Sequence, residues 1–121
     1  MTETEGSAGP DRLAIVRTTV DGIRVITLRG EIDHDTAGGL RQALLPGDGA
    51  VPQRTVIDLS AVTFMDSSGI NTLITAHRAA QGDLGWLRLV GPTEPVRRVM
   101  QIVGLDTVIA CYPTLREALS T

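Results

Sequence analysis

A four-residue segment, Asp66-Ser67-Ser68-Gly69, places one carboxylate and two hydroxyls together. It is followed by a face with helical spacing, formed by Ile70, Leu73, Ile74 and His77. The segment is therefore predicted to begin a helix, where backbone N–H groups lack partners and the helix dipole is positive. A side chain there can cap the helix, which is the commoner role of Asp and Ser, or a hydroxyl can accept a phosphate group.

A phosphate on Ser67 would add about −1.5 to −2 charges next to Asp66 at pH 7. The added charge would oppose docking at a surface that must lose its water to bind a partner. A tenfold loss of affinity requires only about 1.4 kcal/mol. Because the helix dipole offsets part of the repulsion within the chain, we predict that the phosphorylated chain stays folded while its interface weakens.

Hydrolysis is a further hypothesis, because Ser67, His34 and either Asp33 or Asp35 supply the side-chain types of a catalytic triad. The turn is not Gly-x-Ser-x-Gly, and a chain of 121 residues leaves little room for a substrate pocket. We therefore rank hydrolysis last. His77 is expected to be a packed or boundary residue on its helix and not a functional residue.

The rest of the chain must supply the elements that position this segment. Strands are predicted at residues 13–18, 23–29, 54–59, 86–90 and 108–110, the first two joined by the hairpin turn Asp21-Gly22. Helices are predicted after residues 33–36, at residues 66–82, after residues 93–95 and after Thr114. The first of them ends before Pro46 and contains Gly38-Gly39, at a cost of about 1 kcal/mol for each glycine relative to Ala.

This order of elements predicts an α/β fold: a mixed, mostly parallel sheet with an antiparallel N-terminal hairpin and about four helices. Functional residues of such sheets gather beyond the carboxyl ends of the strands. The loop at residues 33–36 and the segment at residues 66–69 both follow strands. We therefore expect them to share one surface.

Length and composition limit the class of protein. A chain of 121 residues with 42% hydrophobic residues fits one globular domain, which we place at residues 11–121 after a flexible tail at residues 1–10. The longest apolar run has five residues, at 108–112, against the roughly 20 needed to span a bilayer. The acidic, glycine-containing start is unlike a signal peptide. We expect a cytoplasmic protein that does not enter the membrane.

Cofactors and nucleic acid are not expected either. Cys111 is the single cysteine and the chain has two histidines, too few soft ligands for a structural metal site. The net charge is −3, and Arg97-Arg98 is the one adjacent basic pair, which disfavours direct binding to a phosphate backbone.

Four stretches carry a resemblance to a known family: 30–33 (Gly-Glu-Ile-Asp), 56–60 (Val-Ile-Asp-Leu-Ser), 64–70 (Phe-Met-Asp-Ser-Ser-Gly-Ile) and 103–105 (Val-Gly-Leu). Together they resemble a STAS domain of the anti-sigma factor antagonist family. The resemblance spans residues 13–120, nearly the whole chain, with the motifs in the expected order.

The resemblance implies a partner switch. Unphosphorylated members bind an anti-sigma factor that is also a serine kinase, and so release a sigma factor for RNA polymerase. The kinase uses ATP and magnesium to phosphorylate the antagonist, which then dissociates from the kinase. A metal-dependent serine phosphatase removes the phosphate and restores binding. By motif position, the acceptor is Ser67, and the partner-binding residues are Asp33, Asp66, Ser67, Ser68 and Gly69. The free chain is expected to be a monomer that needs no cofactor.

A second hypothesis keeps the fold but not the switch. In it, the chain is a STAS module that binds a ligand or serves as a scaffold component of a signalling complex. The intact pair Asp66-Ser67 favours the switch over this alternative.

Overall fold

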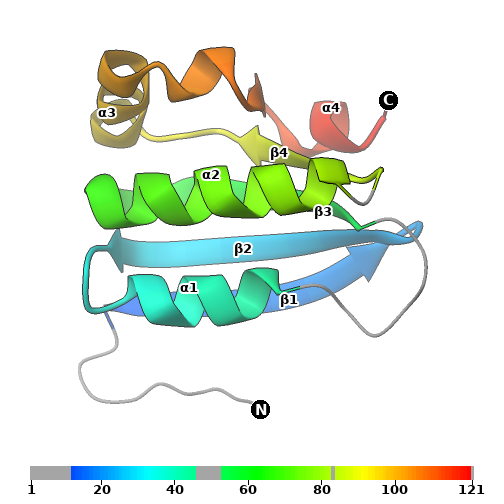
Figure 1. Cartoon of the computed structure of the whole chain (residues 1–121), viewed down its shortest axis with the longest axis horizontal. Helices are drawn as coiled ribbons and strands as arrows, with labels where there is room; N and C mark the ends of the chain where they lie inside the picture. Colours follow the sequence, from blue (N-terminus) through cyan, green and yellow to red (C-terminus); the bar gives the residue numbers. More distant parts are fainter. Residues whose placement is uncertain (1–11, 46–52, 83, 121) are drawn as a thin grey trace.

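The computed structural model describes residues 12–45, 53–82 and 84–120. Its elements, shown in Figure 1, are β1 (Leu13–Val20), β2 (Ile23–Ile32), α1 (Ala37–Leu44), β3 (Arg54–Met65), α2 (Ser67–Gly82), β4 (Trp86–Val90), α3 (Glu94–Val103), the 3₁₀ turn η2 (Leu105–Thr107), β5 (Ala110–Tyr112) and α4 (Leu115–Leu119). The predicted α/β class and order of strands and helices are confirmed. The predicted tail at residues 1–10 and the predicted helix stop at Pro46 lie outside the described residues.

The five strands form one sheet in the order β1-β2-β3-β4-β5. The pair β1 and β2 is antiparallel, and every other neighbouring pair is parallel. Asp21 and Gly22 join the antiparallel pair with φ values of 51° and 80°. Positive φ at both positions is the turn geometry whose twist matches that of the flanking strands, as the Asp-Gly pair predicts.

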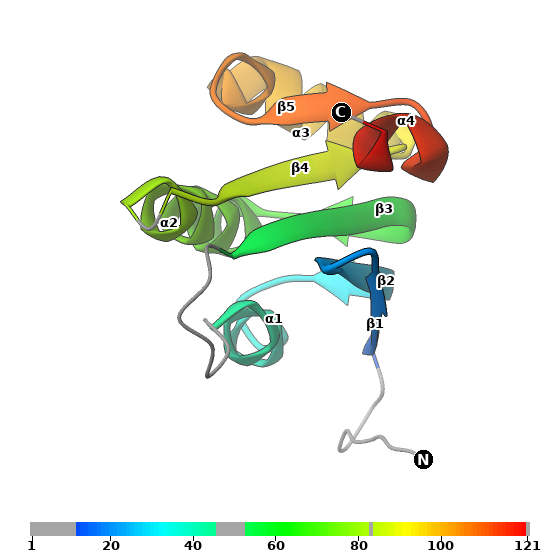
Figure 2. The same cartoon turned by 90° about the vertical axis from the view of Figure 1, so that its right-hand side faces the viewer.

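The two faces of the sheet carry cores of different size. Helices α1, α2 and α3 pack on one face, and their buried side chains join those of the strands in the larger core. Helix α4 covers part of the opposite face and is seen on the other side of the sheet from α1 and α2 in Figure 2. The residues of this second core are Ile23, Val56, Val90 and Ala118, with Trp86, Tyr112, Leu115 and Leu119 packed against them.

The carboxyl-terminal half of β3 departs from the prediction. The predicted strand ends at residue 59, whereas β3 continues to Met65 and pairs with β2 through Ile32 and Met65. Two register shifts occur in this pairing, so the backbone bends and the alternation of buried and exposed residues is lost. The predicted strand is too short, because Ser60 and Thr63 interrupt the apolar pattern beyond residue 59.

The last strand is also displaced from its predicted place. It lies at Ala110–Tyr112 rather than at 108–110, because η2 occupies Leu105–Thr107 and directs Ile109 into the core. The N–H groups of Val108 and Ile109 both donate to the carbonyl of Leu105, at 2.9 Å. A tight turn of this kind leaves no apolar periodicity by which to predict it.

Candidate functional site

The two predicted loops meet at the carboxyl ends of neighbouring parallel strands. Ile32 and Met65, the last residues of β2 and β3, are register partners. The backbone N–H of Asp66 donates to the carbonyl of Ile32 at 3.1 Å, so the turn before α2 is tied to the end of β2. The structure therefore brings the 33–36 loop and the 66–69 segment onto one surface, as the order of elements predicts.

Asp66 and Ser67 have different tasks at the start of α2. Asp66 precedes the helix, and its Oδ1 accepts a hydrogen bond from the Ser68 N–H at 2.8 Å, so Asp66 is the helix cap. Ser67 is the first helical residue and is exposed, and its hydroxyl makes no hydrogen bond within the described residues. Ser68 is half-buried. The capping role and the free hydroxyl thus fall on adjacent residues.

Gly69 sets how closely α2 approaches the sheet. It is buried, and a Cβ at this position would lie 2.7 Å from Cγ2 of Ile32 and 2.7 Å from Cγ of Met65. Real Cβ atoms do not approach carbon so closely. The helix start can therefore rest on the ends of β2 and β3 only because residue 69 has no side chain.

Asp33 organises the neighbouring loop rather than standing free. Its Oδ1 accepts from the backbone N–H groups of Asp35 at 2.9 Å and Thr36 at 3.0 Å, and its Oδ2 accepts from Nη1 of Arg12. Burial acts to raise the pKa of Asp33, but the hydrogen bonds from Thr36 and the positive charge of Arg12 outweigh it, so the pKa is lowered. Asp33 is thus held as a carboxylate.

Arg12 and Phe64 belong to this surface but were missed from the sequence. Arg12 also donates to Asp35 at 2.9 Å and lies 3.9 Å from Glu31, so it joins the end of β2 to the loop that follows it. No local pattern shows this, because the partners lie about twenty positions further along the chain. Phe64, the single phenylalanine, is 47% exposed at the end of β3, where it is the register partner of Glu31.

The geometry does not support the hydrolase hypothesis. Within residues 12–45, 53–82 and 84–120, no hydrogen bond joins Ser67 to His34, and Asp33 and Asp35 are paired with Arg12. His77 is half-buried on α2 and its Nδ1 has no partner among the described residues. In the same part of the chain, no three His, Cys, Asp or Glu side chains are grouped so that they could hold a metal ion.

The STAS domain family model matches residues 14–118. The chain belongs to the STAS domain family. Among the helices described, none combines the length and the apolar character needed to cross a membrane. The exposed Ser67, its cap Asp66 and the buried Gly69 therefore lie at one end of the sheet of a STAS domain.

Curated relatives and solved structures agree with this assignment. The chain is 31% identical to the anti-sigma-F factor antagonist RsfB of Mycobacterium tuberculosis over 93% of its own length and 92% of the relative's. An anti-sigma factor antagonist from Mycobacterium paratuberculosis has a solved structure with 32% identity and a TM-score of 0.79, covering 94% of this chain and 97% of that one.

Two further solved structures are of proteins named SpoIIAA, one in each phosphorylation state. The anti-sigma factor antagonist SpoIIAA in its unphosphorylated form matches with 28% identity and a TM-score of 0.70, covering 88% of this chain and 93% of that one. The Bacillus SpoIIAA structure in the phosphorylated form matches with 27% identity and a TM-score of 0.64, covering 88% and 96%. This fold is thus similar to both forms.

Proposed function

We propose that this STAS domain is an anti-sigma factor antagonist controlled by phosphorylation of Ser67. In the unphosphorylated form it binds an anti-sigma factor that is also a serine kinase, and the sigma factor is released. Phosphorylation of Ser67 by that kinase reverses the binding, and a serine phosphatase restores it. The role is regulatory rather than enzymatic and is carried out in the cytoplasm. The names of the relatives support the antagonist role.

The proposal rests on one observation: Asp66 caps α2, whereas the adjacent Ser67 is exposed and does not cap it. Since Asp66 caps α2, the Ser67 hydroxyl is not needed to satisfy the helix start. It is exposed, so a kinase can reach it without opening the fold. Modification of Ser67 therefore leaves the cap intact, which fits a switch that changes binding and not folding.

The charges around Ser67 indicate why a phosphate would release the partner. Asp66 is adjacent to Ser67, and Glu31, Asp33 and Asp35 belong to the neighbouring strand end and loop. Arg12 is already engaged with these three acids. A phosphate would add about −1.5 to −2 charges to an acidic surface. Only about 1.4 kcal/mol of repulsion on docking is needed for a tenfold weaker complex.

Mass spectrometry tests the acceptor. The purified chain is incubated with ATP, magnesium and a candidate anti-sigma kinase, and the products are examined by intact-mass and tandem measurements. We expect one phosphate on Ser67, none on the Ser67→Ala variant, and full modification of the Ser68→Ala control. Phosphate on Ser68, or undiminished modification of Ser67→Ala, would refute the assignment.

Calorimetry tests the release step with the same kinase. Ser67→Ala is expected to bind as the unphosphorylated chain does, and Ser67→Glu at least about tenfold more weakly. Ser120→Glu, which adds the same charge after α4, serves as the control and is expected to bind normally. Equal affinities for Ser67→Glu and Ser67→Ala would show that charge at this position does not drive release.

A further inference from the structure

Arg12 approaches the surface around Ser67 from the far side of β2. It directly precedes β1, and in the order of the sheet β1 and β3 lie on opposite sides of β2. The Arg12 carbonyl accepts a hydrogen bond from the Glu31 N–H at 2.7 Å. Gly30 has a φ of 118°, and a Cβ there would lie 2.0 Å from the carbonyl oxygen of Arg12. The backbone of Arg12 can therefore lie against the end of β2 only because residue 30 is glycine.

The guanidinium group of Arg12 joins three acids of this surface. Nη1 donates to Oδ2 of Asp33 and lies 3.9 Å from Oε1 of Glu31, and Nη2 donates to Oδ2 of Asp35 at 2.9 Å. The Asp33 side chain is 18% exposed, against 76% for Asp35, so the pair with Asp33 is less screened by water and salt. The planar fork of an arginine binds two carboxylates in a fixed geometry, whereas a lysine ammonium group is a point charge on a flexible stem.

Asp33 connects Arg12 to the backbone of the 33–36 loop. Its Oδ1 accepts from the N–H groups of Asp35 at 2.9 Å and Thr36 at 3.0 Å. Oγ1 of Thr36 accepts from the Asp33 N–H at 2.8 Å and donates to the Glu31 carbonyl at 2.9 Å. Because one carboxylate binds both the guanidinium group and the loop backbone, the position of Arg12 constrains the conformation of the whole loop.

Arg12 also offsets acidic charge next to the phosphorylation site. Within the described residues, it is the basic residue that pairs with Glu31, Asp33 and Asp35. Its removal would leave the surface with one more unit of negative charge, at least about half of what a phosphate on Ser67 adds. Loss of Arg12 should therefore resemble a partial phosphorylation in its effect on docking.

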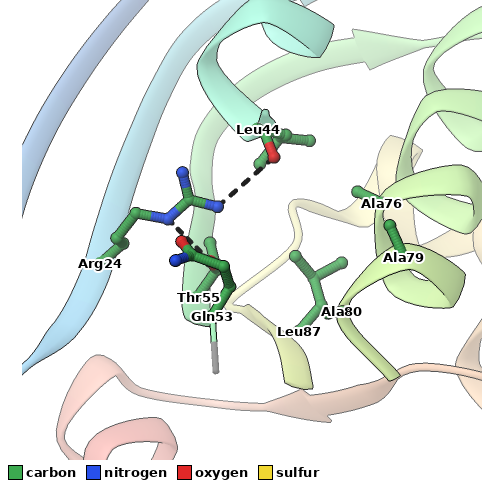
Figure 3. Close-up of a pocket in the computed structure, with 8 residues that line it drawn as sticks. All are labelled: Arg24, Leu44, Gln53, Thr55, Ala76, Ala79, Ala80 and Leu87. Atoms are coloured by element: carbon green, nitrogen blue, oxygen red, sulfur yellow. Dashed lines mark hydrogen bonds between the residues drawn. The ribbon is translucent and has the colours of Figure 1, made fainter. Parts of the chain in front are cut away.

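The opposite end of α1 is held by a different arginine. The guanidinium group of Arg24 donates to the Leu45 carbonyl at 2.8 Å and to Oγ1 of Thr55 at 3.1 Å. Figure 3 shows Arg24 lying between the end of α1 at Leu44 and Thr55 on β3. Thr55 lies near the beginning of β3, whereas Ser67 follows the end of that strand. A change in the loop before α1 therefore leaves this attachment intact.

We propose that Arg12 is a positioning residue of the docking surface, which holds the 33–36 loop in the conformation that the anti-sigma partner binds and offsets part of the acidic charge beside Ser67. This role rests on the proposed antagonist function. It adds to the partner-binding surface a residue that lies outside the four stretches by which the chain resembles its family.

Calorimetry with the kinase that modifies Ser67 tests this role on the full-length, unphosphorylated chain. We expect Arg12→Ala to bind about three- to tenfold more weakly than the natural chain, and Arg12→Lys to lie between the two, because it keeps the charge and loses the fork. In the Asp33→Asn background the loss from Arg12→Ala should be smaller, since Arg12 acts in part through Asp33. In the phosphorylation assay, Arg12→Ala should raise KM and leave kcat unchanged, because the Ser67 hydroxyl is not altered.

Two matched arginine variants separate this role from net charge and from stability. Arg29→Ala removes the same charge from an exposed residue near the same end of β2 and should bind normally. Arg24→Ala removes the arginine at the other end of α1, so it should lower Tm and leave the affinity unchanged. The proposed role is overturned if Arg12→Ala binds as tightly as the natural chain, or if either control weakens binding as much as Arg12→Ala does.

Amide hydrogen exchange tests the attachment of the loop without a partner. The N–H groups of Asp35 and Thr36 should exchange faster in Arg12→Ala than in the natural chain, and that of Leu73 inside α2 should not change. Equal exchange in the loop would overturn the positioning role whether or not a kinase binds. If the loop exchanges faster but no anti-sigma kinase binds the natural chain, the proposed antagonist function is overturned, and the docking role of Arg12 with it.

Discussion

Replacement of Gly69 by alanine should destabilise the domain, although alanine is the better helix former. The added Cβ would lie 2.7 Å from Cγ2 of Ile32 and 2.7 Å from Cγ of Met65, and both side chains are buried. Neither atom is the mobile tip of a long side chain. Ile32 is β-branched and belongs to a strand, so the helix start itself must move away from the sheet.

The size of the effect follows from two opposing terms. Overpacking a dense core costs about 1–3 kcal/mol, and a Gly-to-Ala change within a helix returns up to about 1 kcal/mol. We expect the Gly69→Ala variant to be less stable by about 1–2 kcal/mol, which lowers Tm by about 3–8 °C for a domain of this size. Because Ser67 moves with the helix start, its phosphorylation should also slow.

Gly38→Ala provides a matched control of opposite sign. Gly38 lies inside α1, is exposed, and would place its Cβ with no atom within 4 Å. This variant should gain about 0.5–1 kcal/mol. Urea unfolding is followed by the fluorescence of Trp86, the single tryptophan, whose ring lies 3.7 Å from the guanidinium carbon of Arg88.

The two glycine variants decide the argument together. If Gly69→Ala is as stable as Gly38→Ala, the helix start is not held against the sheet at the distance described. If both variants lose stability, the stabilisation expected from replacing glycine by alanine within a helix does not apply to this chain.

Three further predictions concern the same surface. Asp66→Ala should cost about 1 kcal/mol in thermal unfolding through the lost cap, and Asp66→Asn much less, because its amide oxygen can still accept from Ser68; equal losses would contradict the capping role. Because the pKa of Asp33 is lowered in the folded state, its carboxylate stabilises the domain above its ordinary pKa of about 3.9, and this contribution is lost as pH falls through the lower folded value. Acid unfolding of Asp33→Asn should therefore depend less steeply on pH than that of the natural chain, and identical profiles would refute this. Phe64→Ala should weaken binding of the unphosphorylated chain to its anti-sigma partner by about tenfold or more with little change in Tm, whereas the exposed control Ile102→Ala should bind normally.

Local sequence signals predicted the elements well where neighbouring residues define them. Asp21-Gly22 makes the hairpin turn, and the Thr114 side chain caps α4 by accepting from the Glu117 N–H at 3.2 Å. Each signal needs only a few consecutive residues. The second half of β3 was missed because its strand character comes from pairing with β2 through two irregularities, and not from its own alternation.

The sequence predicted which residues form the site, but it did not predict which of them caps the helix. The spacing of Asp66, Ser67 and Ser68 indicates a helix start, yet it leaves open which side chain caps it. The structure assigns the cap to Asp66. Asp33 was expected to face a partner, and its assignment to partner binding stays a prediction. The structure adds that its carboxylate is bonded to Arg12 and to the loop backbone.

The sequence by itself determined the α/β order, the turn and capping residues, and the placing of Ser67 at the beginning of a helix, since these depend on backbone preferences that act over a few residues. The tertiary structure decided the rest: the contact of Gly69 with two strand ends and the pairing of Arg12 with Asp33. These contacts depend on strand register and helix placement. Such choices are set by the burial of the whole core, and no short stretch of the chain contains them.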